Sequence, residues 1–310
     1  MESSASSNSQ LKKLLAKYTN VFKEGIGKLR KFTAKIKLKA NAKPVFMKAR
    51  SVPFAIRGLV DDELARLVKE DILESVEHSE WATPIVPVIK PDRTVRICGD
   101  FKQTLNPVIE RDEYPLPKID EAFAKIAGGQ KFSKLDVKHA YLHMPMDTAS
   151  RALLTINTPK GLFRYKRMVF GLSMAPAVWQ RTMEEIFKGI DNIIVFLDDI
   201  LVTGKTDSEH LDTLEQVIRR LEEYDLRLNL NKCQFFLPSV TYCGFKIDKH
   251  GLHKTSEKIE AICKAPAPKN VTEVKAFTGL VNYYARFLPN LATTLYPINQ
   301  LLHKNQKFVW

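Results

Sequence analysis

Two adjacent aspartates interrupt one of the most apolar stretches of the sequence. Residues 192–205 read NIIVFLDDILVTGK, so Asp198 and Asp199 lie between two runs of β-branched and other apolar side chains. Each run has the length and composition of a short buried strand. The pattern therefore predicts a tight hairpin with the two carboxylates at or beside its turn.

Two interpretations of this pair are open. Aspartate is a common turn residue and needs no further function there. However, no glycine accompanies the pair, and the apolar flanks place both carboxylates near the core, where like charges repel unless a cation or a raised pKa relieves them. The stretch KFSKLDVKHAY supplies a third carboxylate, Asp136, near the end of another apolar strand. Three carboxylates without His or Cys at metal spacing favour an all-oxygen site for Mg²⁺ or Mn²⁺.

Strand-like and helix-like segments alternate up to about residue 250, and helical patterns alone follow from about residue 255. A helix is predicted over residues 59–74, and another begins at APAVWQ with proline near its first position. A capping box, Thr206 to Glu209, predicts the start of a third. This order indicates an α+β body followed by a small helical unit.

The formal charge of +13 is concentrated at the start of the chain, where residues 1–50 contain 13 Lys and Arg against two Glu. A polyanionic partner and a merely solvated basic arm both explain this excess. The first ten residues, MESSASSNSQ, predict a disordered leader. No apolar run approaches the roughly 20 residues that cross a bilayer. With no C-x-x-C spacing among the four cysteines, we expect an intracellular protein with reduced thiols and no membrane partner.

The motifs around the aspartates resemble a known family. FLDDIL resembles the aromatic-x-Asp-Asp box of reverse transcriptases, and SKLDVKHAY resembles their first catalytic motif. The likeness extends in order through SEWATPIVPVIKPDRTVRICGDFKQTLN, GLFRYKRMVFGLSMAPAVWQ, NKCQFFLPSVTYCGF and VNYYARFLPNLATTLYPINQLL. In this order of motifs the sequence is similar to gypsy-type (Metaviridae) LTR retrotransposon polyproteins.

The resemblance implies a right-hand polymerase of the α+β class, with fingers, palm and thumb and an antiparallel palm sheet that carries the aspartate triad. Residues 1–58 would be a basic N-terminal arm with a disordered leader. Residues 59–250 would form the fingers and palm, and residues 251–310 the helical thumb and the start of the connection. The implied activity is that of an RNA-directed DNA polymerase, a nucleotidyltransferase that extends a primer with dNTPs on an RNA or DNA template.

The resemblance also assigns site residues. The catalytic carboxylates are Asp136, Asp198 and Asp199, which would hold two Mg²⁺ ions (Mn²⁺ as a substitute) with the carbonyl of Val137. Residues that match dNTP-binding positions of the family are Lys90, Arg96, Ala140, Tyr141, Phe170 and Gly171. Residues that match the hairpin holding the primer terminus are Tyr242, Cys243, Gly244 and Phe245.

Simpler interpretations of some residues remain. Tyr141 is the implied gate against a ribose 2′-hydroxyl, but an ordinary core tyrosine also fits, as core filling does for Phe170. Lys90 is either a phosphate contact or a solvated loop lysine. The chain also departs from the family pattern, with Phe196 in place of the usual tyrosine of the box and Gly99 in place of a larger residue.

The family implies an RNA template, a DNA primer/template duplex and dNTPs as partners. Such a domain is normally joined to ribonuclease H and integrase in a polyprotein, and it acts in a cytoplasmic virus-like particle or in the nucleus. A catalytically inert retroelement-derived fragment that binds nucleic acid or protein is the alternative.

Overall fold

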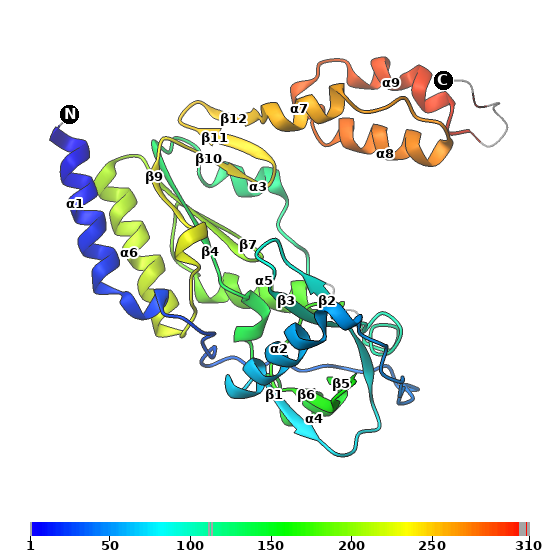
Figure 1. The fold of residues 1–310 in the computed structure, drawn as a ribbon. Coiled ribbons are helices and arrows are strands. Elements are labelled where there is room, and N and C mark those ends of the chain that lie inside the picture. The colour runs from blue at the N-terminus through cyan, green and yellow to red at the C-terminus, as the bar shows by residue number, and fades with distance from the viewer. Residues whose placement is uncertain (1, 111, 113, 304–307, 309–310) are drawn as a thin grey trace. The chain divides into compact units, whose positions relative to one another are not determined.

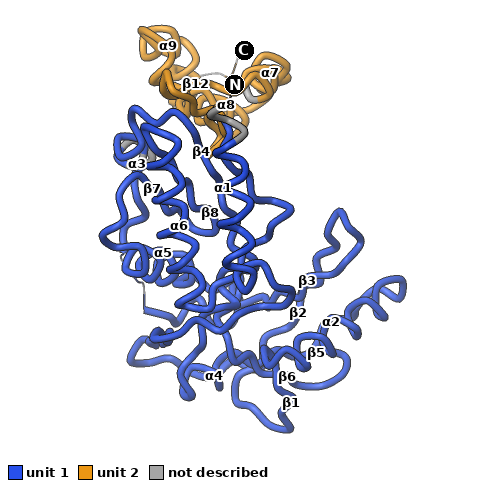
Figure 2. Tube along the Cα trace, turned by 90° about the vertical axis from the view of Figure 1, so that its left-hand side faces the viewer, with its two compact units in different colours: residues 1–237 blue, residues 238–310 orange. Residues whose placement is uncertain are grey.

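The computed structural model describes residues 2–110, 112, 114–303 and 308. The chain divides into two compact units, residues 1–237 and residues 238–310 (Figure 2). The division falls at residue 237 rather than at the expected residue 250. The physical reason is that the three strands after residue 237 form a sheet of their own.

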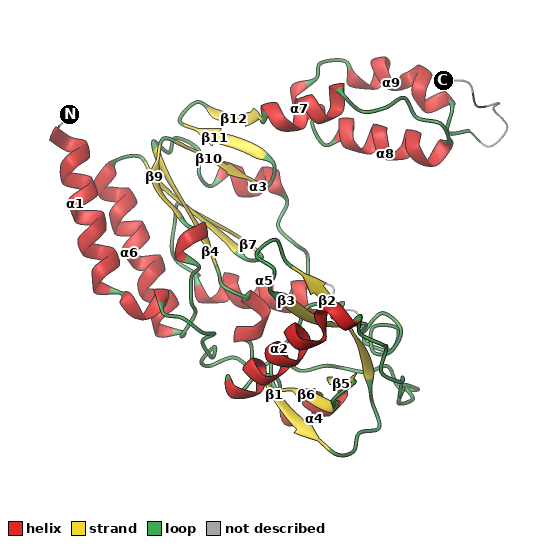
Figure 3. Ribbon diagram, in the orientation of Figure 1, coloured by secondary structure: helices red, strands yellow, loops and turns green. Residues whose placement is uncertain are grey.

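Unit 1 combines helices with two sheets (Figures 1 and 3). Its α-helices are α1 (Glu2–Lys17), α2 (Arg57–Lys69), α3 (Ile119–Ala124), α4 (Thr148–Leu153), α5 (Ala175–Ile186) and α6 (Asp207–Glu223). Its short 3-10 helices are η1 (Thr19–Phe22), η2 (Phe54–Ile56), η3 (Ala140–His143) and η4 (Leu230–Lys232). Its strands are β1 (Leu73–Val76), β2 (Thr83–Ile89), β3 (Val95–Gly99), β4 (Lys131–Asp136), β5 (Thr155–Thr158), β6 (Gly161–Tyr165), β7 (Ile193–Phe196), β8 (Asp199–Gly204) and β9 (Gln234–Leu237).

The predicted hairpin is confirmed as part of a four-stranded antiparallel sheet. Its strand order is β7-β8-β4-β9, and β7 and β8 are joined by the two residues Leu197 and Asp198. One face of the sheet carries the completely buried side chains of Leu135, Ile200 and Val202. Because neighbouring residues of a strand point to opposite faces, Asp136 and Asp199, which pair in register, leave that buried side.

The second sheet of unit 1 has five strands in the order β1-β6-β5-β2-β3. The pairing of β2 with β5 is parallel, and the others are antiparallel. Strands β2 and β3 form a hairpin that places Lys90 in its turn and Arg96 on its second strand. Helix α2 contacts both β1 and β3, which fixes this hairpin to the body of unit 1.

The N-terminal segment differs from the expected arm with a disordered leader. Residues 2–10 belong to α1, which lies beside α6 (Figure 1). Leu14 and Tyr18 are buried in the core of unit 1, and Lys17 pairs with Glu215 at 2.6 Å. The polar leader is ordered because the apolar residues that follow it extend the same helix onto α6.

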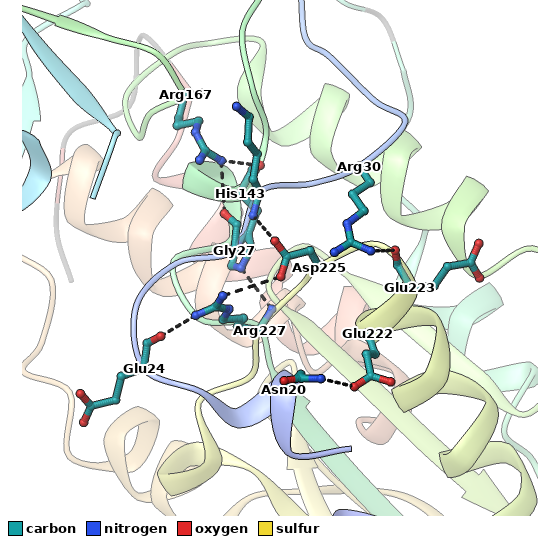
Figure 4. A network of polar contacts seen from close by, with 11 residues as sticks. Asn20, Glu24, Gly27, Arg30, His143, Arg167, Glu222, Glu223, Asp225 and Arg227 are labelled. Carbon is teal, nitrogen blue, oxygen red and sulfur yellow. Dashed lines mark hydrogen bonds and ion pairs between the residues drawn. The ribbon is translucent and has the colours of Figure 1, made fainter. Parts of the chain in front are cut away.

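A network of polar contacts fastens the segment after α1 to the rest of unit 1 (Figure 4). The buried guanidinium of Arg167 donates to the carbonyls of Gly27 and His143, both at 3.2 Å. The backbone N–H of Lys28 donates to Asp225 Oδ2 at 2.9 Å, and Arg227 donates to the carbonyl of Glu24. The basic segment is therefore an integral part of the fold.

The charges of this segment nevertheless face outward. Between residues 28 and 39 the lysines are exposed, whereas Leu29, Ala34 and Ile36 are buried. Exposed and buried residues thus alternate here, although this stretch makes only isolated bridges at Ala34 and Leu38 among the described residues. The apolar residues anchor the segment, and the lysines form a basic strip on its surface.

Unit 2 begins with three antiparallel strands, β10 (Ser239–Tyr242), β11 (Phe245–Asp248) and β12 (Gly251–Lys254). Its helices are α7 (Ser256–Cys263), α8 (Val271–Asn282), the 3-10 helix η5 (Ala285–Phe287) and α9 (Leu291–Gln300). Helix α8 contacts both α7 and α9. Across the described part of both units, no helix has the length and apolarity needed to cross a membrane.

We predict that Gly27→Ala lowers the free energy of unfolding of the chain by about 1–3 kcal/mol. A Cβ atom at residue 27 would lie 1.9 Å from the backbone oxygen of Asp225, so the N-terminal segment would have to shift. Urea denaturation followed by circular dichroism measures the change. The matched control is Gly58→Ala in α2, where an added Cβ meets nothing within 4 Å and should leave stability equal or raise it by up to about 1 kcal/mol. Equal stability of the two variants would contradict this account of the docking.

Candidate active site

The structure brings the three predicted aspartates together at one end of the four-stranded sheet. Asp136 is the last residue of β4, and Asp199, the first residue of β8, pairs with it in register. Asp198 occupies the turn immediately before β8. The hairpin thus presents two carboxylates beside a third, as the apolar context of the sequence predicted.

The turn that carries Asp198 is held by helix α5. Leu197 has a φ angle of 52°, a left-handed conformation that non-glycine residues rarely adopt. Trp179 Nε1 donates to the carbonyl of Leu197 at 3.0 Å, and the Leu197 N–H donates to Gln180 Oε1 at 2.8 Å. From the β4 side, the Val137 N–H donates to the carbonyl of Asp198 at 2.8 Å. These three hydrogen bonds fix the peptide groups on both sides of the carboxylate.

Burial and mutual repulsion disfavour the charged forms of two of the carboxylates. Burial is the main cause that raises the pKa of Asp198 to about 6, and the charges of Asp136 and Asp199 add to it. Burial likewise raises the pKa of Asp136. Two lysines offset part of this negative charge: Lys134 Nζ lies 2.9 Å from Asp199 Oδ2, and Lys232 Nζ lies 3.7 Å from Asp136 Oδ2.

The donor set fits a hard divalent cation. All three side chains offer oxygen, the ligand that Mg²⁺ prefers, and Asp198 Oδ1 is buried with no hydrogen-bond partner among the described residues. The carboxylates are neighbours. In the described part of the chain, however, no group of three or more Asp, Glu, His or Cys side chains is arranged so that it could hold a metal ion. The ligand set therefore stays a prediction.

The residues predicted to bind a nucleotide join the carboxylates through a chain of aromatic contacts. The guanidinium carbon of Arg96 lies 5.0 Å from the ring centroid of Phe170. The rings of Phe170 and Tyr141 are 4.7 Å apart, and those of Tyr141 and Trp179 are 6.2 Å apart. Because Trp179 also donates a hydrogen bond to the turn at Leu197, one continuous set of contacts connects Arg96 to the hairpin that carries Asp198 and Asp199.

The environment of Tyr141 shows that it borders the carboxylates. Its side chain is buried, and this burial, with a smaller effect of the Asp198 charge, raises the pKa of Tyr141 to about 12. Ala140 beside it is completely buried, and its methyl group can make no polar contact. The placement fits both the gate and the core interpretation of Tyr141.

His139 is a neighbour of the site that the sequence reasoning missed. Its φ angle of 50° is left-handed, and its ring is half-buried. Burial is the main cause that lowers the pKa of His139 to about 4, followed by the charges of Lys90, Arg66 and Arg96. The positive charges of Lys90 and Arg96 therefore both act on this imidazole.

Gly171 occupies a position that requires glycine. Its φ angle is 93°, and a Cβ atom there would lie 3.2 Å from the carbonyl oxygen of Gly99. Gly99 in turn has the ring of Phe101 where its own Cβ would be, at 2.6 Å from the nearest ring atom. The small residue at position 99, a departure from the family pattern, is thus compensated by the aromatic ring two residues later.

The residues predicted to hold a primer terminus lie in unit 2. Tyr242 and Phe245 are buried, whereas the turn residues Cys243 and Gly244 are partly exposed. The hydroxyl of Tyr283 donates to the carbonyl of Cys243 at 2.5 Å, and that of Tyr284 donates to the carbonyl of Gly244 at 3.2 Å. The buried pair therefore supports the turn, and two tyrosines of the VNYYARF motif hold its backbone.

Several of these supporting residues carried a signal in the sequence. Trp179 and Gln180 lie in the APAVWQ stretch, which was used only to predict a helix and to support the resemblance. Lys134 stands two residues before Asp136, and two residues along a strand share a face. The contacts of all three with the hairpin depend on tertiary packing, which the local pattern does not encode.

Comparisons with known proteins identify the family to which the chain is similar. The family model of reverse transcriptase (RNA-dependent DNA polymerase) matches residues 90–247. An uncharacterized protein of Caenorhabditis elegans is 36% identical over 274 residues, which cover 87% of this chain and 21% of that protein. The transposon Tf2-7 polyprotein of Schizosaccharomyces pombe is 32% identical over 253 residues, which cover 81% of this chain and 19% of the polyprotein. The chain thus spans about a fifth of the length of the curated relatives it matches.

Solved structures show the same fold. A foamy viral protease-reverse transcriptase in complex with double-stranded DNA superimposes with a TM-score of 0.87 at 24% identity, over 98% of this chain and 64% of that one. The corresponding complex with an RNA/DNA hybrid gives a TM-score of 0.83 at 24% identity, over 97% and 41% of the two chains. The predicted α+β right-hand polymerase fold is confirmed.

We predict that Asp198→Asn raises the free energy of unfolding by about 1–2 kcal/mol at about pH 8 in the presence of a chelator. The pKa of Asp198 is raised from 3.8 to about 6 in the folded protein, so the folded state holds a proton that the unfolded chain releases. Stability therefore falls as the pH rises through this window, and a neutral amide avoids the loss. Below the unfolded pKa, the difference between variant and wild type should vanish.

Urea denaturation across this pH range measures the effect. Asp191→Asn, at an exposed position just before β7, is the control and should leave the stability unchanged. An Asp198→Asn variant that is less stable than the wild type at alkaline pH would show that the buried carboxylate is not a strained charge.

Proposed function

The chain belongs to the reverse transcriptase (RNA-dependent DNA polymerase) family, and from this premise we propose that it extends a DNA primer with dNTPs on an RNA or DNA template. The observation that carries the proposal is the continuous contact from Arg96 through Phe170, Tyr141 and Trp179 to the turn beside Asp198. It joins a cationic group suited to a triphosphate to carboxylates suited to divalent cations.

The carboxylates of Asp136, Asp198 and Asp199 would hold the divalent ions, with the Val137 carbonyl as a further oxygen ligand. Bound in such a site, two ions activate the attacking hydroxyl and stabilise the charge on the transferring phosphoryl group. The protein's own contribution is positional. The hydrogen bonds of Trp179 and Gln180 to Leu197 fix the backbone of the turn before any ligand arrives.

The nucleotide would be held by groups on two sides of the carboxylates. Arg96 presents a planar guanidinium, whose paired N–H groups match triphosphate oxygens, and Phe170 supports it from one face. Lys90 supplies a second positive charge near His139. The ring of Tyr141 would lie under the sugar and exclude a 2′-hydroxyl group, with Ala140 next to it in the chain.

The wider setting of the chain is also a proposal. The sequence likeness to a retrotransposon polyprotein supports a gypsy-type LTR element as the source, in which this domain would be joined to further enzymes. The solved foamy viral complexes with double-stranded DNA and with an RNA/DNA hybrid support such duplexes as ligands. The buried primer-hairpin residues and the tyrosines that brace the turn would support the duplex end in unit 2.

Primer extension tests the activity directly. We expect the wild type to extend oligo(dT) on poly(rA) with dTTP and Mg²⁺, and Asp198→Asn to lose at least about 100-fold in rate, because removal of one charge-stabilising group typically costs that much. Asp191→Asn is the matched control and should keep full activity. Extension that persists in Asp198→Asn would contradict the role of this carboxylate. Template binding without any extension by the wild type would instead favour the inert binding fragment.

The gate role of Tyr141 makes a second prediction. Tyr141→Ala should raise the relative incorporation of rNTP over dNTP by about tenfold or more, because the ring that meets the 2′-hydroxyl is lost. Tyr141→Phe keeps the ring and should retain discrimination. Competition assays with dTTP and UTP measure the ratio. An unchanged ratio in Tyr141→Ala would identify Tyr141 as a core residue only.

A further inference from the structure

Lys134 lies among the catalytic carboxylates although no part of the proposed reaction uses it. It stands two residues before Asp136 on β4, so both side chains belong to one face of the sheet. On the neighbouring strand, Asp199 pairs with Asp136 in register, which makes Lys134 and Asp199 diagonal neighbours. Their Nζ and Oδ2 atoms are 2.9 Å apart.

This ion pair is more sheltered than the other one at the site. The side chains of Lys134 and Asp199 are 24% and 31% exposed. The pair of Lys232 with Asp136 is longer, at 3.7 Å, and its lysine is 66% exposed. A short, partly buried pair is screened less by water and salt than an exposed one. Lys134 is therefore the stronger resident cation of the site.

We propose that Lys134 is an internal counter-cation that competes with a divalent ion for Asp199 and thereby sets the affinity of the site for that ion. An ammonium group and a divalent cation satisfy the same carboxylate charge, and the fixed lysine repels a second cation nearby. Lys134 Nζ contacts the Oδ2 atom of Asp199. A divalent ion that takes this oxygen must therefore displace the ammonium group.

The competition has a consequence for Asp198. Its Oδ1 atom is buried and accepts no hydrogen bond from any described residue, so it is the carboxylate oxygen best prepared to receive an ion. Asp136 and Asp199 each already have a lysine partner, and the pair of Asp199 with Lys134 is the shorter of the two. An ion would accordingly bind to Asp198 with little rearrangement. Binding of the ion by Asp199 would then depend on displacement of Lys134.

The test measures Mn²⁺ binding to the full chain without nucleotide or nucleic acid, by the electron paramagnetic resonance signal of free Mn²⁺. We expect Lys134→Met to bind Mn²⁺ about tenfold or more tightly than the wild type, and Lys134→Arg, which keeps the charge, to resemble the wild type. Lys131→Met is the matched control, because it removes an equal charge from the same strand at the far end from Asp136. It should change the affinity by less than about twofold.

A double-mutant cycle makes the attribution specific. In an Asp199→Asn background, the Lys134→Met substitution should tighten Mn²⁺ binding much less than in the wild type, because the carboxylate under competition is gone and only the repulsion between the lysine and the ion is left to remove. Circular dichroism and thermal melting in a chelator confirm that each variant is folded. An affinity of Lys134→Met that equals or falls below that of the wild type would overturn the proposal and show that Lys134 supports the site rather than competing in it.

The inference rests on the proposed function, since it assumes that the aspartates take divalent ions. The two can fail separately. Mn²⁺ binding by the wild type that Lys134→Met leaves unchanged would overturn only the competition. A wild type that binds no Mn²⁺ would overturn the ion site and the competition together.

Discussion

Repulsion between carboxylates at the end of two apolar strands is the constraint on which the rest of unit 1 depends. Burial and neighbouring charges raise the pKa of Asp198 to about 6, so the folded chain works against its ionised form near neutral pH. The turn that carries it also includes Leu197 at a positive φ angle, a conformation that costs about 1–3 kcal/mol. Helix α5 stabilises this turn through the hydrogen bonds of Trp179 and Gln180 to the backbone of Leu197. The sheet, the helix and the turn therefore form one unit whose least stable point is the candidate site.

The aromatic contacts give this arrangement a second role. Trp179 bonds to the turn and also packs beside Tyr141, which in turn contacts Phe170. A shift of the hairpin would consequently move the ring expected under the sugar, and a shift of Arg96 would be felt by Phe170. The ring proposed to select the nucleotide and the turn that carries the carboxylates are thus connected through three aromatic side chains. Enzymes accelerate reactions in part by holding the reacting groups in a fixed geometry, and contacts of this kind fix the geometry of a site.

The sequence allowed the hairpin, the neighbouring strand of Asp136 and the α+β class to be predicted, because strand length and apolar patterning are local properties. The family resemblance assigned Arg96, Tyr141 and Phe170 to one nucleotide-binding site. It did not reveal the bonds of Trp179 and Gln180, since these depend on how α5 packs against β7. Nor did it reveal the ordered N-terminus, because a Ser-rich stretch has no strong pattern and its partners are about 200 residues away. The boundary at residue 237 was missed because strand pairing, rather than composition, decides where the units divide.

The docking of the N-terminal segment has a consequence for the order of events during synthesis. Lys17, Asn20 and Glu24 find their partners in residues 215–227, so the first tenth of the chain leaves the ribosome long before anything can receive it. Contacts between residues this distant in sequence slow folding. Until these contacts form, apolar residues such as Leu14 and Val21 stay exposed to solvent. Completion of α6 and the stretch after it would therefore be the step that commits unit 1 to its native structure. A ribosome that stalls before residue 227 would hold a nascent chain in which the residues of α1 are already synthesised, whereas part of the segment that they pack against is still missing.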